Sequence, residues 1–261
     1  MYLIIRNMMV IIGISIYITM NIYNALLISL LAGFSTLIGG LFICVKKIDF
    51  KVLLIYLSIT IMMMIGISLF DLIPNALPAL YDKYNIKSLL VIISLMIVSY
   101  LIIKVLSKFK KEDNSLFHLG IISMIVLVIH NFPEGIITFL TSYIDIKLGI
   151  KTSIAIALHN IPEGMMIAVP IYYASGSCKK ALLYTFIASF AEPLGAGVAY
   201  LFLKNYITSI GISYILIIVA GLMISLALEE IYPYIERHYE RKPILIGLLI
   251  GLVLIIMSLF I

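Results

Sequence analysis

The sequence HNFPEG at residues 130–135 recurs as HNIPEG at residues 159–164, and each copy lies inside a long apolar run. An α-helix turns once every 3.6 residues, so the His and the Glu of each copy share one helix face. The Pro has no N–H and clashes with the preceding turn, which frees the carbonyl groups of Ile129 and Leu158 and kinks both helices. Two facing copies therefore predict a cage of imidazole, carboxylate and amide groups for a divalent cation.

Packing is the simpler interpretation of any single buried His, because most such residues are satisfied parts of a core. The two copies, however, match at five of six positions and differ only at Phe132 and Ile161. An ionisable side chain at the centre of a bilayer also costs about 2.5–3.5 kcal/mol on insertion scales, and is functional by default. These observations favour a metal site.

The composition is that of a membrane protein. Of the 261 residues, 63% are hydrophobic and 12% are charged, whereas about 25% of the residues of a soluble domain are charged. Apolar stretches of about 20 residues, separated by short charged loops, predict transmembrane helices. The net charge of +5 reflects loop lysines and arginines, so we expect a multi-pass protein of the cell membrane, surrounded by lipid, with no nucleic-acid partner.

Hydropathy predicts eight core spans within residues 24–261. Residues 1–23 precede them and contain Arg6 and a short apolar run. This segment is either an N-terminal extension or one extra helix. As an extension, it is a signal-like segment or the result of an early start codon. The two cysteines, Cys44 and Cys178, predict no disulfide framework. The spans lie at about residues 25–45, 52–72, 89–106, 116–141, 149–172, 181–203, 212–232 and 244–260.

Loop charges predict the orientation. The loops after spans 1, 3, 5 and 7 carry twelve Lys and Arg residues, and those after spans 2, 4 and 6 carry five. By the positive-inside rule the first set lies in the cytoplasm, so both ends of the eight-span core face outward.

A weaker repeat relates residues 64–74 (MIGISLFDLIP) to residues 223–233 (MISLALEEIYP). Span 2 runs outward and span 7 inward, so the repeat is inverted, as in many secondary transporters. Asp71 and Glu230 occupy matching positions, three residues before a Pro. We interpret them as steps on the route by which a cation enters or leaves; chance similarity and ordinary interfacial residues are the alternatives.

Two adjacent metal positions follow from the ligand types. The first has two imidazoles and two carboxylates, which suit a four-coordinate site: His130, Glu134, His159 and Glu163. The second has oxygen ligands and shares both hexapeptide Glu residues as bridges: Asn131, Asn160 and Glu192. This thiolate-free set favours zinc or iron and tolerates other divalent ions. Because binding requires neutral imidazole and ionised carboxylate, acid should weaken it.

The paired hexapeptides, followed by EPLGA at residues 192–196, resemble the ZIP (Zrt/Irt-like) family of divalent metal transporters, in particular its bacterial ZupT-like branch. The resemblance covers about residues 24–261. It implies an all-α polytopic membrane protein, an eight-helix 3+2+3 bundle with inverted repeats, and a binuclear metal centre between spans 4 and 5. It also implies a homodimer that moves zinc, and also iron, manganese and cadmium, into the cytoplasm, without a resident cofactor or catalytic residues.

Two other classes of protein fit the sequence less well. A membrane-embedded metalloprotease normally carries HExxH, with a Glu base beside two His ligands. The order here is H-N-x-P-E-G, which supplies no such base. A structural or signalling protein would leave three intramembrane carboxylates and two imidazoles without a role, so a transporter is favoured.

Overall fold

The structure is a computed structural model that describes residues 2–45, 49–108, 115–203 and 208–260. Nearly all of these residues are helical, and none of them lies in a strand. Seven helical stretches are long and apolar enough to cross a membrane, and the longest, residues 50–107, contains two spans. The prediction of an all-α polytopic membrane protein is therefore confirmed.

The described helices form eight successive segments, in the predicted order. Three segments contain a π-helical turn, and a short 3₁₀ turn, η2 (Asn85–Lys87), joins the second segment to the third. The segments are α1 (Tyr2–Val45); α2 (Phe50–Ile67) with η1 (Ser68–Leu72) and α3 (Ile73–Tyr84); α4 (Ser88–Ser107); α5 (Ser115–Ile144); α6 (Ile146–Ser175); α7 (Cys178–Val198) with η4 (Ala199–Leu203); α8 (Ser209–Leu226) with η5 (Ala227–Ile231) and α9 (Tyr232–Arg237); and α10 (Arg241–Leu259).

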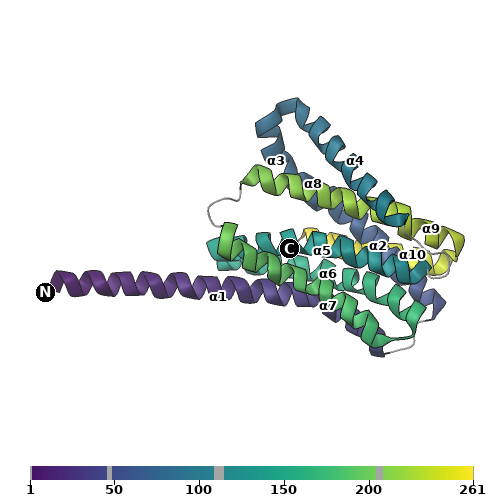
Figure 1. Cartoon of the computed structure of the whole chain (residues 1–261), viewed down its shortest axis with the longest axis horizontal. Coiled ribbons are helices and arrows are strands. Elements are labelled where there is room, and N and C mark those ends of the chain that lie inside the picture. Colours follow the sequence, from purple (N-terminus) through teal and green to yellow (C-terminus); the bar gives the residue numbers. More distant parts are fainter. Residues whose placement is uncertain (1, 46–48, 109–114, 204–207, 261) are drawn as a thin grey trace.

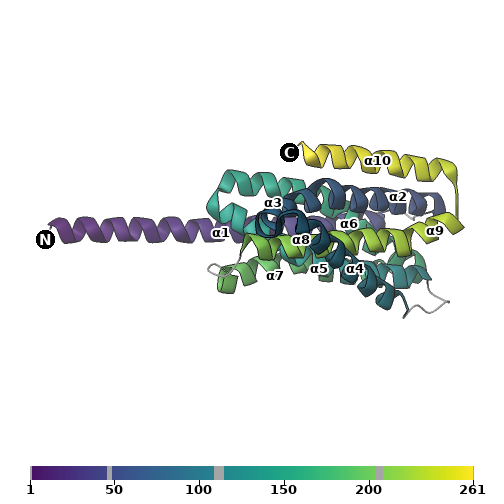
Figure 2. The ribbon, with the colours of Figure 1, turned by 90° about the horizontal axis from the view of Figure 1, so that it is seen from above.

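The first helix begins earlier than the predicted first span. It runs without interruption over 44 residues from Tyr2 to Val45, about 66 Å at 1.5 Å per residue. The hydrocarbon core of a bilayer is about 30 Å thick. The N-terminal half of α1 extends alone beyond the other helices (Figures 1 and 2). Residues 2–23 thus continue into the first span as one helix.

Two further features differ from the sequence-based expectations. The second span was predicted to end near Leu72, but its helix continues to Tyr84 through Pro74 and Pro78. Pro74 is the second residue after the π-helical turn, where the regular hydrogen-bond ladder is already altered. Cys178, the first residue of α7, is disulfide-bonded, although the sequence predicts no disulfide framework.

The helices separate into two groups. The α5, α6 and α7 helices pack closely with one another and with the C-terminal half of α1. The second group contains α2–α3, α4, α8–α9 and α10, with α10 lying along α2 (Figure 2) and α4 along α8. Contacts between the groups are sparser and involve mainly α2 with α6, α5 with α8 and α10 with α6. Both hexapeptides lie in the first group.

The π-helical turns bear out the weaker sequence repeat. The η1 turn (Ser68–Leu72) and the η5 turn (Ala227–Ile231) lie 159 residues apart, and each leads into a helix whose second residue is Pro. The packing of α4 on α8 is matched by that of α10 on α2. Segments 1–3 and 6–8 thus form the two repeats that flank α5 and α6, as the 3+2+3 arrangement predicts.

Candidate metal centre

The two hexapeptides meet between α5 and α6, and each helix continues through its proline. The Glu134 Oε1 atom lies 3.0 Å from His159 Nε2 and 3.2 Å from His130 Nε2. The His130 Nε2 atom is also 3.4 Å from Glu163 Oε1. All four side chains are at most 8% exposed. The His and Glu of both copies therefore form one buried cluster.

This cluster has the dimensions of a metal site. Ligand atoms of His130, Glu134 and His159 all lie within 4.8 Å of one another. A zinc ion bound by imidazole nitrogen and carboxylate oxygen lies about 2.0–2.2 Å from each ligand atom. Small side-chain movements are enough to bring these three ligand atoms around one ion, and Glu163 adjoins them through its 3.4 Å contact with His130 Nε2.

The two asparagines and Glu192 lie beside this cluster. Asn160 Nδ2 donates to Glu192 Oε2 at 3.0 Å and to the carbonyl oxygen of Ala32 at 3.2 Å. Asn131 Nδ2 donates to the carbonyl oxygen of Ala188 at 3.3 Å. Asn131, Asn160 and Glu192 are each 0% exposed. The amide groups are thereby fixed by the neighbouring helices, with their oxygen atoms left over.

Several of these buried oxygen atoms have no hydrogen-bond partner within the described parts of the chain. Leaving such an atom unsatisfied costs about 1–3 kcal/mol, more if it is charged. A cation removes this cost, because it accepts lone pairs from carboxylate and amide oxygens alike. The residues therefore fit a divalent ion as cargo. The atoms are Glu134 Oε2, Glu163 Oε2, Asn131 Oδ1 and Asn160 Oδ1.

Glycines allow the helices to approach closely at the centre. A Cβ atom on Gly135 of α5 would lie 1.8 Å from the carbonyl oxygen of Glu192 on α7. A Cβ atom on Gly164 of α6 would lie 1.8 Å from the carbonyl oxygen of Thr36 on α1. The last residue of each hexapeptide must therefore be glycine for α7 and α1 to pack this tightly.

The chain is similar to known proteins over most of its length. A family model described as ZIP zinc transporter matches residues 108–259. The chain is 33% identical to the zinc transporter ZupT of Clostridium perfringens over 92% of this chain and 96% of that protein. It is 34% identical to ZupT of Streptococcus mutans (92% and 97%) and 35% identical to ZupT of Chlorobium luteolum (92% and 98%). This chain belongs to the ZIP family. It is thus a multi-pass protein of the cell membrane from a family of divalent metal transporters.

In this ZIP protein the two acidic residues of the weaker repeat lie outside the His/Glu cluster. Asp71 in η1 is half-buried and accepts a hydrogen bond from Asn75 Nδ2 at 2.7 Å. Glu230 in η5 is 4% exposed, and its neighbour Glu229 is exposed. The matched positions therefore differ in their exposure, and their role in the ion's route stays a prediction.

Sequence reasoning missed two buried threonines near the centre of this ZIP protein. Thr138 lies one helical turn after Glu134, and its hydroxyl donates to Glu192 Oε1 at 3.4 Å. Its four-residue spacing from Glu134 places it on the metal-binding face and was the available signal. Thr36 on α1 is 0% exposed and touches the second hexapeptide through its backbone. Only the packing of α1 on α6 brings it there.

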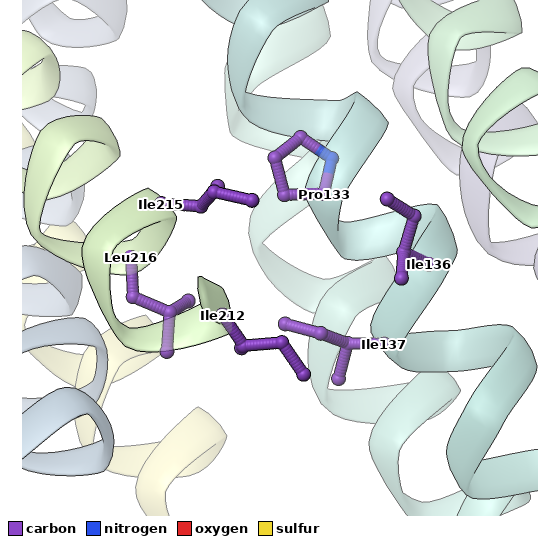
Figure 3. Close-up of a pocket in the computed structure, with 6 residues that line it drawn as sticks. All are labelled: Pro133, Ile136, Ile137, Ile212, Ile215 and Leu216. Carbon is purple, nitrogen blue, oxygen red and sulfur yellow. The ribbon is translucent and has the colours of Figure 1, made fainter. Parts of the chain in front are cut away.

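A small pocket lies between α5 and α8, where the two helix groups of the ZIP fold meet (Figure 3). Its lining is entirely apolar, so it offers no ligand for an ion. Pro133 connects it to the first hexapeptide. The lining residues are Pro133, Ile136, Ile137, Ile212, Ile215 and Leu216.

Proposed function

We propose that this ZIP protein takes up divalent transition-metal cations into the cytoplasm through a two-ion centre between α5 and α6. Zinc is the principal ion, and iron, manganese and cadmium compete with it. The observation that carries the proposal is the convergence of two imidazoles and two carboxylates, from side chains at most 8% exposed, in the middle of two membrane-spanning helices.

The first ion position uses the stronger ligands. Glu134 already lies between the two imidazoles, at 3.0 and 3.2 Å. A bound cation takes the place of these contacts, so binding exchanges existing interactions and does not require new groups to be buried. The residues proposed for this position are His130, Glu134, His159 and Glu163.

The second position uses weaker ligands. Amide oxygen binds a divalent cation less tightly than thiolate or imidazole, and Glu134 and Glu163 are shared between the two positions. An ion held in this way leaves more easily than one in a closed, thiolate-rich site, which is what transport requires. The residues proposed to complete this position are Asn131, Asn160 and Glu192.

The direction of transport rests on charge and on the acidic residues of the two π-helical turns. The excess of loop lysine and arginine on one side marks that side as cytoplasmic. Asp71 in the outer part of the second span then attracts arriving cations, and Glu230 serves their departure on the inner side. The ligand pattern lacks the base of a zinc hydrolase, so we propose no enzymatic activity.

Radiolabelled zinc uptake into proteoliposomes tests the proposal. His159→Ala and Glu163→Gln should each lower uptake by more than about tenfold, since each removes a ligand. His238→Ala and Glu229→Gln are matched controls, because both side chains are exposed and a ring nitrogen of His238 is hydrogen-bonded to the Tyr234 carbonyl one turn earlier, at 2.9 Å. Iron, manganese and cadmium should compete with zinc.

Wild-type protein that moves no zinc above the level of empty vesicles would contradict the proposed transport. If the site variants transport zinc as well as the two controls do, the ion route does not pass through the hexapeptides. Metal-dependent peptide hydrolysis by the purified protein would instead support the metalloprotease alternative.

A further inference from the structure

Contacts around the centre relate α1 to α7 by the inverted repeat. Gly164 packs on the carbonyl of Thr36, and Gly135 packs on the carbonyl of Glu192, both with a hypothetical Cβ–oxygen distance of 1.8 Å. The two glycines lie 29 residues apart, and Thr36 and Glu192 lie 156 residues apart. Thr36 is therefore the counterpart of Glu192.

A second pair of contacts obeys the same relation. Asn160 Nδ2 donates to the Ala32 carbonyl at 3.2 Å, and Asn131 Nδ2 donates to the Ala188 carbonyl at 3.3 Å. The asparagines again lie 29 residues apart and the alanines 156 residues apart. The close approaches and the hydrogen bonds are independent observations, and both give the same 156-residue offset between α1 and α7.

The correspondence predicts the direction in which Thr36 points. Glu192 reaches across the centre to Asn160, the asparagine of the hexapeptide on the other helix, at 3.0 Å. The same relation directs Thr36 toward Asn131. Asn131 Oδ1 is buried and accepts no hydrogen bond from any described residue.

The Thr36 hydroxyl is itself unsatisfied. A buried Ser or Thr in a helix ordinarily donates to the carbonyl one turn earlier, as Thr185 does to Ala181 at 2.9 Å. For Thr36 that acceptor is the Ala32 carbonyl, which already accepts from Asn160 and Ser35. The Thr36 side chain is 0% exposed, and its Oγ1 has no hydrogen-bond partner among the described residues.

We propose that Thr36 is a ligand-site residue of the second metal position, and that its neutral hydroxyl, opposite the carboxylate of Glu192, sets how tightly that position holds a divalent cation. A hydroxyl oxygen suits the harder divalent ions. A second carboxylate would bind the cation more strongly and slow its departure. Because Thr36 is neutral where Glu192 carries a carboxylate, this position binds the cation weakly enough for it to leave during transport.

This inference rests on the proposed two-ion centre and is tested by equilibrium binding of zinc and manganese to purified protein, together with zinc uptake. Thr36→Val keeps the side-chain shape but removes the hydroxyl. It should lower the affinity for the more weakly bound ion by about 3- to 10-fold and leave the affinity for the more tightly bound ion unchanged. Thr36→Ser keeps the hydroxyl and should bind within about twofold of wild type. Thr36→Asp should tighten the looser ion and slow uptake.

Thr185→Val is the matched control, because Thr185 is equally buried but bonds within its own helix. Equal ion binding by Thr36→Val and wild type would overturn the inference, and so would equal losses in Thr36→Ser and Thr36→Val, which would indicate a packing role. Those results would leave the proposed function standing if Glu192→Gln still lost the looser ion. Wild-type protein that binds a single ion would refute the two-ion centre itself.

Discussion

Replacing Gly135 by alanine tests whether the close approach of α5 and α7 sets the geometry of the metal centre. The added Cβ would lie 1.8 Å from the carbonyl oxygen of Glu192, whereas ordinary contact begins at 3.4 Å. The two backbones must therefore separate by about 1.6 Å, because a close-packed interior has no free space to absorb the methyl group. Overpacking of this kind costs about 1–3 kcal/mol of folding free energy.

The functional effect should exceed the loss of stability. Glu192 moves with its backbone, which disturbs its 3.0 Å contact with Asn160, and a misplacement of about 1 Å in an active centre can cost on the order of 10²-fold. We expect Gly135→Ala to lower zinc uptake by about that factor. Gly164→Ala, which drives α1 from α6 in the same way, should behave similarly.

Gly197→Ala provides the control on the same helix, α7. A Cβ at this position meets no atom within 4 Å, and alanine favours a helix over glycine by about 1 kcal/mol. Uptake should be unchanged and the thermal midpoint in detergent should not fall. If Gly135→Ala takes up zinc at the wild-type rate, measured beside Gly197→Ala in matched vesicle preparations, the argument that helix spacing positions Glu192 is refuted.

Three further predictions concern single contacts. Thr138→Val removes the hydroxyl that donates to Glu192 at 3.4 Å and should weaken zinc binding by about 3- to 10-fold, whereas Thr141→Val, whose hydroxyl bonds within α5, should not; binding isotherms decide this. Asp71→Asn retains a hydrogen-bonding partner for Asn75 but removes the charge, so the KM of uptake should rise while the number of bound ions stays constant. Lowering the pH from about 7.5 to about 5.5 should weaken zinc binding, because protons compete with the metal for the imidazole and carboxylate ligands; equal affinities at the two pH values would contradict this.

The fold was largely predictable because lipid leaves a chain few options. A span must satisfy its own backbone hydrogen bonds, so hydropathy alone located eight helices in order. Hydropathy did not locate two ends. The second span continues to Tyr84 past Pro74, because a π-helical turn accommodates the proline. The first helix begins at Tyr2, since nothing in the sequence breaks it before Val45.

The candidate centre was predictable where its ligands lie close together in sequence. The four-residue spacing of His130 and Glu134 put both on one face, and their repetition supplied the opposite wall. The contact between Asn160 and Ala32 spans 128 residues and depends on the packing of two distant helices. Thr36 carries no distinguishing neighbours, so its position became apparent only through such contacts.

Each π-helical turn also sets the rotational phase of the helix beyond it. One residue contributes about 100° of rotation in an α-helix, so the extra residue of a π-turn offsets everything that follows by about that angle. Asp71 and Glu230 lie at the changes of phase in η1 and η5, two of the three π-helical turns. Deleting a single apolar residue from η1 or η5 would leave the hydropathy of the span almost unchanged, and the chain would still enter the bilayer. It would nevertheless turn every later side chain of that segment away from its present neighbours, so insertion and correct assembly would become separable steps.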